Sequence, residues 1–211
     1  MKKSFDYKIA YFIIGKILFG IYFILTRIKF YGLDNIPKKG PVLFICNHIR
    51  NLDAPAAAFA GVKIGRYPKI FAKVSLWKTK VPILKSFLNF IEAIPVERNS
   101  SKAKNSLNIA KKQLRQNEYI VIFPEGTTSK IKNGELLKFK TGAARLALSC
   151  PSVCIIPAAG DFVKGRLRVL IGPQLKFSYE ESVEGLTKKM RCEIDKLLKE
   201  VREIRKEKND V

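Results

Sequence analysis

Residues 41–53 read PVLFICNHIRNLD, in which an apolar run ends at Cys46 and a more polar stretch begins at Asn47. The apolar part predicts a buried β-strand, because short runs rich in β-branched and aromatic residues favour strands. The polar residues after it predict a loop, and we expect a helix to begin near Ala54. A strand followed by a loop and a helix is the repeating unit of α/β proteins.

The same alternation continues through the rest of the chain. Strands are expected at residues 42–46, 69–73, 93–97, 119–123, 153–158 and 168–171. Helices are expected at residues 81–90, after Ser100 and Ser101, at 141–148, and from Val183 onward, where apolar residues recur every three or four positions. The sequence therefore predicts one α/β domain, residues 31–211, with a mostly parallel or mixed sheet flanked by helices.

The N-terminal residues 9–26 read IAYFIIGKILFGIYFILT, in which Lys16 is the single charge. A helix needs about 20 apolar residues to cross a bilayer, so this run is borderline for a full crossing and is equally suited to lying in the interface. Its aromatic side chains favour a lipid interface over a buried core helix. A secretory signal is the remaining alternative, but no small-residue cleavage site follows. We expect residues 1–30 to be a hydrophobic membrane-anchoring helical segment.

The net charge is strongly positive, since 40 Lys and Arg face 18 Asp and Glu, giving +22. Such a surplus implies an anionic partner, which can be nucleic acid, an acidic membrane surface or a phosphorylated substrate. The apolar N-terminal run favours membrane lipids, because each basic residue near an anionic leaflet contributes about 1 kcal/mol of attraction. We expect location at the cytoplasmic face of a membrane, such as a bacterial inner membrane, and no nucleic-acid partner.

The four cysteines contain no Cys-x-x-Cys pair, which is typical of a reduced chain rather than a disulfide framework. The single histidine, His48, excludes a site built from several histidines, and we expect no metal. G-x-S-x-G, P-loop and G-x-G-x-x-G motifs do not occur, which argues against serine esterases, NTPases and dinucleotide enzymes.

His48 follows the first predicted strand, and Asp53 comes five residues later. Strand ends in α/β folds favour catalytic groups, because the sheet fixes the loop and the loop exposes the side chain. On an ideal helix the two residues would lie about 140° apart, so they meet only if the chain turns between them. A carboxylate that accepts one ring N–H makes the other ring nitrogen more basic. The pair is a candidate general-base dyad, although a chance spacing is the alternative.

Residues 123–129, FPEGTTS, follow another predicted strand. Gly126 permits a tight turn and close approach of a ligand, and backbone N–H groups near it are candidate donors to an oxyanion. Glu125 and Thr127 add polar groups, so we interpret all three as candidate substrate-binding residues. The structural alternative is an ordinary turn between a strand and a loop.

Two cations also stand at predicted strand ends, Lys73 and Arg98. If the strands are parallel, their carboxyl ends meet at one edge of the sheet. Arginine binds a phosphate through its bidentate fork and lysine binds it as a point charge. Together they are a candidate phosphate site, whereas each taken singly is more often a surface charge.

Taken in order, these motifs resemble those of the membrane-bound glycerolipid acyltransferases typified by lysophosphatidic acid acyltransferases. The resemblance covers residues 31–171 and rests on YGLDNIP at 31–37, Asn47-His48 with Asp53 (N-H-x4-D), Ala72-Lys73 with IPVER at 94–98, FPEGT at 123–127, FKTGAA at 139–144 and IIPA at 155–158.

The resemblance implies a function in phospholipid biosynthesis. It implies a membrane-associated enzyme that moves a fatty acyl group from a thioester to the free hydroxyl of lysophosphatidic acid, giving phosphatidic acid. In this reading His48 is the base and Asp53 orients it, while the acceptor phosphate lies near Lys73 and Arg98. The donor is acyl carrier protein or acyl-CoA, and no cofactor is needed.

One position departs from the family pattern, because Thr128 stands where an arginine commonly follows F-P-E-G-T. If that arginine holds the acceptor phosphate, its role falls here to Arg98, Lys73 or Lys130, or the acceptor differs. Glycerol 3-phosphate or another lysophospholipid is therefore an alternative acceptor. A non-catalytic basic protein that binds membrane surfaces or nucleic acid is the alternative from another class.

Overall fold

The computed structural model describes residues 13–14, 17, 20–21, 23–24, 27–48, 53–78, 85, 88–89, 91–97, 103–128, 135–163 and 166–204. Within them seven strands form one sheet: β1 (Lys29–Tyr31), β2 (Val42–Cys46), β3 (Pro68–Lys73), β4 (Ile94–Val96), β5 (Tyr119–Ile122), β6 (Cys154–Val163) and β7 (Arg166–Ile171). The helices are α2 (Asp53–Lys63), α4 (Ala103–Arg115), α5 (Gly142–Leu148) and α6 (Val183–Glu203), with short 3-10 helices η1 (Leu33–Asn35) and η2 (Val74–Lys78).

The sheet is mixed, as predicted. Its order is β1-β7-β6-β2-β5-β3-β4. The five strands from β6 to β4 are parallel, whereas β7 is antiparallel to β6 and β1 is parallel to β7. Strand β2 lies in the middle, between β6 and β5, and all five of its residues are buried. The carboxyl ends of the parallel strands therefore meet along one edge, which is where ligands bind in α/β sheets.

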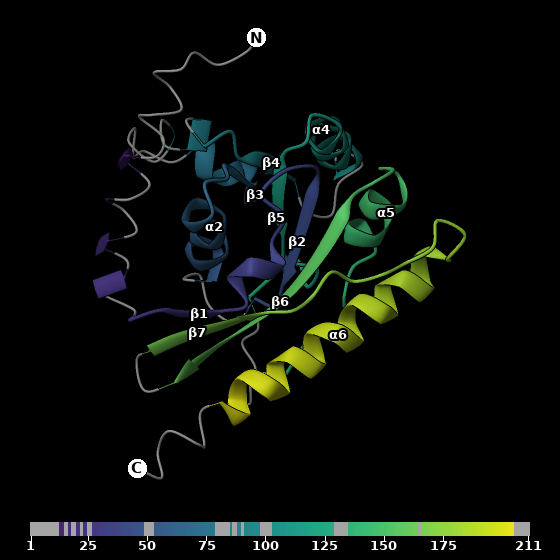
Figure 1. The fold of residues 1–211 in the computed structure, drawn as a ribbon. Coiled ribbons are helices and arrows are strands. Elements are labelled where there is room, and N and C mark those ends of the chain that lie inside the picture. Colours follow the sequence, from purple (N-terminus) through teal and green to yellow (C-terminus); the bar gives the residue numbers. More distant parts are fainter. Residues whose placement is uncertain are drawn as a thin grey trace.

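Helices cover both faces of the sheet, and the side chains of β2 alternate between the two layers. Leu43 and Ile45 join the core under α4, α5 and α6. Val42 and Phe44 join the core on the opposite face, which α2 covers. Figure 1 shows α2 on one side of the strands and α4, α5 and α6 on the other. Burial on both faces explains why the β2 sequence is continuously apolar rather than alternating.

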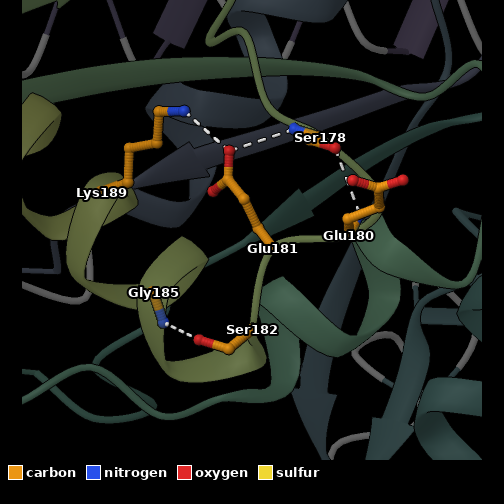
Figure 2. A network of polar contacts seen from close by, with 6 residues as sticks. All are labelled: Ser178, Glu180, Glu181, Ser182, Gly185 and Lys189. Atoms are coloured by element: carbon orange, nitrogen blue, oxygen red, sulfur yellow. Dashed lines mark hydrogen bonds and ion pairs between the residues drawn. The ribbon is translucent and has the colours of Figure 1, made fainter.

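The C-terminal helix α6 has the amphipathic pattern expected from the sequence. Its buried residues are Leu186, Met190, Ile194, Leu197, Leu198 and Val201. The N-cap Ser182 accepts a hydrogen bond from the Gly185 N–H at 3.0 Å, and Glu181 accepts from Lys189 and from the Ser178 N–H (Figure 2). The apolar face of α6 is thus packed on the sheet, chiefly against β6 and β7.

Two parts of the sheet differ from the expected elements. The strand expected at residues 153–158 continues to Val163 and forms a hairpin with β7. Strand β1 was not expected, because three residues are too short for a periodic signal. Ile28 is buried in the core beside α2, and Lys29 and Phe30 pair with β7. The sheet therefore includes two residues that the expected division placed in the anchoring segment.

The described residues between 13 and 24 are helical and expose large apolar side chains, namely Ile13, Ile14, Ile17, Ile21, Phe23 and Ile24. In the part of the chain covered by the structure, no helix combines the length and apolarity that a bilayer crossing requires. Membrane anchoring by residues 1–30 stays a prediction. Of the helix expected at 81–90, residues 85, 88 and 89 are helical.

Candidate active site

His48 lies just beyond the carboxyl end of β2. The residue before it, Asn47, pairs with β6 through its side chain, as a strand backbone would. The Asn47 amide is buried, donates from Nδ2 to the Gly160 carbonyl at 3.0 Å and accepts at Oδ1 from the Gly160 N–H at 2.8 Å. Both main-chain groups of Gly160 on β6 are therefore satisfied by one side chain. These bonds extend the pairing of β2 with β6 by one step and hold the backbone that carries His48.

Glu125 supports the same backbone from the other side. Strand β5 neighbours β2, so the loop after β5 lies beside His48. The Glu125 carboxylate is 3% exposed; Oε1 accepts from the His48 N–H at 2.7 Å and Oε2 accepts from the Leu137 N–H at 3.0 Å. Hydrogen bonds of this kind offset much of the cost of burying a carboxylate. The structure thus places Glu125 behind the site, where it joins three loops.

Gly126 adopts a left-handed conformation, with φ of 67°, which suits glycine. Its N–H donates to the Phe123 carbonyl at 2.9 Å and closes a turn. A Cβ at this position would come within 3.1 Å of the Lys140 side chain, which would have to shift slightly to make room. Because the Gly126 amide is used in the turn, it is not available as a donor to an oxyanion.

The His48 ring stacks on Phe123, with ring centroids 4.4 Å apart and an angle of 27° between the rings. Both rings line a cavity of about 420 Å³. Its apolar wall comprises Phe71, Val96, Leu107, Ile122, Phe123, Pro124 and Ala143, and its polar lining includes Glu97, Ser106, Thr141 and the cations Lys104, Lys140 and Arg145. An imidazole in an apolar cavity with cations suits an amphiphile that has an anionic group and a reactive hydroxyl.

Of the predicted site residues, His48 and Gly126 line this cavity. Lys73 lies two residues beyond Phe71 on β3, hence on the same face of the sheet, but it is exposed and outside the lining. Thr127 is also exposed and outside the lining.

Three predicted roles concern atoms that the structure does not describe. Asp53 is the first residue of α2, but its side chain lies outside the described part of the chain. Arg98 and Lys130 lie outside the described residues altogether. The dyad and the second phosphate ligand therefore stay predictions. Among the residues that are described, no three His, Cys, Asp or Glu side chains gather as metal ligands would.

Sequence reasoning did not assign roles to Asn47, Lys104, Lys140 or Arg145. For Asn47 a signal existed. It lies on the same face of the strand as Leu43 and Ile45, which point into the core, and a polar side chain at such a position needs hydrogen-bonding partners. For the cations no signal existed, because only the fold brings Lys104 beside Lys140 and Arg145.

The Acyltransferase family model matches residues 27–160, more than half of the chain. The chain belongs to the acyltransferase family. The chain is 32% identical over 129 residues to a probable 1-acyl-sn-glycerol-3-phosphate acyltransferase of Mycoplasma genitalium, covering 60% of the chain and 46% of that protein. It is 34% identical over 134 residues to the 1-acyl-sn-glycerol-3-phosphate acyltransferase of Borreliella burgdorferi, covering 62% and 48%.

The acyltransferase chain therefore spans about half the length of the curated relatives that it matches. Its fold is similar to the crystal structure of the 1-acyl-sn-glycerophosphate (LPA) acyltransferase PlsC from Thermotoga maritima. The TM-score is 0.69 at 22% identity, with 94% of this chain and 79% of that chain covered. The chain thus shares a fold with that solved structure over most of its length.

Proposed function

We propose that this acyltransferase moves a fatty acyl group from a thioester to the free hydroxyl of lysophosphatidic acid, giving phosphatidic acid. The observation that carries the proposal is the position of His48, stacked on Phe123 inside an apolar cavity that also contains cations. The names of the two relatives support the acceptor, since both are called 1-acyl-sn-glycerol-3-phosphate acyltransferases.

In the proposed reaction the His48 imidazole removes the proton of the acceptor hydroxyl, and Asp53 orients the ring. The oxygen attacks the thioester carbonyl, and the tetrahedral intermediate collapses to an ester. The leaving thiolate takes the proton back from the imidazolium, so no acyl-enzyme is required. General-base catalysis contributes about 10²- to 10⁴-fold, and the positioning of two substrates supplies much of the rest.

The acceptor phosphate is proposed to bind at the cationic edge of the cavity. Lys140 supports this, because its side chain lies over Gly126 and lines the same cavity as His48. Lys73 and Arg98 remain candidates from the strand ends, and the Thr127 hydroxyl adds a donor. Together these groups would take the place of the arginine that the family commonly has at the position of Thr128.

The site of action is proposed to be the cytoplasmic face of a membrane. The exposed isoleucines among residues 13–24 supply an apolar surface, and the +22 charge attracts anionic lipids. An enzyme held in this plane meets both its lipid acceptor and its lipid product where they reside.

The test is an acceptor panel with the purified full chain in detergent micelles. Lysophosphatidic acid, glycerol 3-phosphate and lysophosphatidylcholine are offered with labelled acyl-CoA or acyl carrier protein, and the products are separated by chromatography. We expect lysophosphatidic acid to give the highest kcat/KM. His48→Ala should lower kcat by about 10² or more, with a thermal midpoint lowered by no more than a few degrees through the lost stacking on Phe123, while Lys138→Ala on the exposed surface changes neither.

Two results would overturn the proposal. One is a His48→Ala variant with near wild-type turnover, which would remove the base from the mechanism. The other is a wild-type protein that does not prefer lysophosphatidic acid, either because it acylates none of the three acceptors or because another acceptor gives a higher kcat/KM.

A further inference from the structure

A second cavity lies beside the one that contains His48. It has a volume of about 240 Å³ and lies between α4 and α5. Lys104, Leu107 and Arg145 line both cavities, so the two are adjacent. We call the second cavity the α4–α5 groove; its remaining lining is Asn108, Lys111, Leu146 and Ser149.

The α4–α5 groove follows one face of α4. Its α4 residues are spaced as neighbours on one helical face, at positions 104, 107, 108 and 111. Seven residues of helix rise about 10 Å, which sets the distance from Lys104 to Lys111 along the axis. Lys104 is in the first turn of α4, close to the carboxyl edge of the sheet where β4 ends. Lys111 therefore marks the far end of the groove.

The charged residues that line the groove are all cations. Within the described residues, Lys104, Lys111 and Arg145 form no ion pair with a carboxylate, and α4 contains no acidic residue. Arg145 donates from Nε to the Thr141 hydroxyl at 3.3 Å, which orients the guanidinium. Like charges along a narrow groove repel one another, and a bound anion relieves that repulsion.

Two substrates must meet at His48, and the cavity beside the FPEGT loop suits the acceptor. We propose that the α4–α5 groove binds the phosphopantetheine arm of the acyl donor, with the thioester directed toward His48 and the phosphate near Lys111 and Arg145. The inference rests on the proposed function and adds the donor to it. Leu107 and Leu146 can pack on the methylene groups of the arm, whereas the Asn108 and Ser149 side chains offer hydrogen bonds to its amides. Carrier protein and coenzyme A both carry this arm.

The experiment compares donors that do and do not carry the phosphate. kcat/KM is measured in detergent with palmitoyl-CoA, palmitoyl carrier protein and palmitoyl-pantetheine, at saturating lysophosphatidic acid. The variant is Lys111→Gln and the matched control is Lys112→Gln, which removes the same charge from the adjacent exposed position outside the groove. Arg145→Gln is a second variant, and thermal unfolding checks that each protein folds.

We expect Lys111→Gln to lose about tenfold in kcat/KM with the two phosphate-bearing donors and about twofold or less with palmitoyl-pantetheine. Lys112→Gln should resemble wild type with all three. A loss that is larger with the carrier protein identifies the carrier as the natural source of the arm, and a larger loss with palmitoyl-CoA identifies coenzyme A.

An equal loss with palmitoyl-pantetheine, or equal losses for Lys111→Gln and Lys112→Gln, would overturn the inference, because neither pattern reports a phosphate in the groove. A deficit confined to assays with phosphatidylglycerol vesicles would also overturn it and assign Lys111 to the membrane surface. If wild type transfers palmitate but Lys111→Gln and Arg145→Gln match it, this inference alone fails. If wild type transfers from none of the donors, the proposed function fails.

Discussion

The carboxylate of Glu125 accepts a hydrogen bond from the backbone N–H of His48 at 2.7 Å, across 77 residues of sequence. Its second oxygen accepts from the Leu137 N–H, so one buried side chain connects the loops after β2 and β5 with the segment that leads to α5. Asn47 holds the same backbone from β6. The imidazole therefore projects from a loop that is fixed on both sides.

Replacing Glu125 tests whether this support matters for the proposed chemistry. In Glu125→Gln one oxygen becomes an NH₂ group that faces a backbone N–H, so a buried donor loses its acceptor. We expect a loss of about 1–3 kcal/mol in the free energy of unfolding and a fall of about tenfold or more in kcat, with a smaller change in KM. Glu200→Gln on the exposed face of α6 is the control. An unaltered kcat despite lower stability would limit Glu125 to a structural role.

Asn47→Ala should weaken the connection between β2 and β6. The substitution removes two hydrogen bonds and leaves the Gly160 N–H and C=O without these partners in a buried place. The free energy of unfolding should fall by about 2–4 kcal/mol. Chemical denaturation measures this loss, and kcat should fall with it. Comparable stability to wild type would mean that water replaces the amide.

Phe123→Leu tests the stacking of the His48 ring. An aromatic pair contributes about 0.5–1.5 kcal/mol beyond its buried area, and here it also sets the plane of the imidazole. We expect kcat to fall several-fold. Phe177→Leu is a matched control, since it removes the edge-on pairing with Tyr179 outside the lining of the His48 cavity. Equal kcat in both variants would argue against a role for the stacking.

The start of α6 should show a dependence on pH. Hydrogen bonds from Lys189 and from the Ser178 N–H lower the pKa of the partly exposed Glu181 carboxyl (Figure 2). The folded state therefore favours the ionised carboxylate. The stabilisation that this carboxylate provides is present above its pKa in the unfolded chain, and it is lost as the pH falls through its lower pKa in the folded protein. The difference in thermal midpoint between wild type and Glu181→Gln should be largest near neutral pH and shrink below about pH 4. Glu180→Gln should show little difference at any pH; a constant difference for Glu181→Gln would contradict the assignment.

The local sequence predicts most of the elements but not all of them. Apolar runs at 42–46 and 119–122 and the helical period from Val183 are strong signals, and each element forms where expected. Strand β1 and the extension of β6 to Val163 were not predicted. Both are stabilised by pairing with β7, and their own sequences contain no pattern that indicates this pairing. The helix ends differ by a residue or two, as caps and fraying usually cause.

By itself, the sequence determined that His48 leaves an apolar strand and that the FPEGT run leaves another, since both follow from local periodicity and turn chemistry. Only the tertiary structure decided that β5 and β6 are the neighbours of β2, and hence that Glu125 and Gly160 hold the His48 loop. The same holds for Lys104, which the fold brings beside Lys140 and Arg145 near the start of α5. The physical reason is that strand order and helix packing depend on contacts between residues far apart in the chain, and no local window of sequence contains both partners.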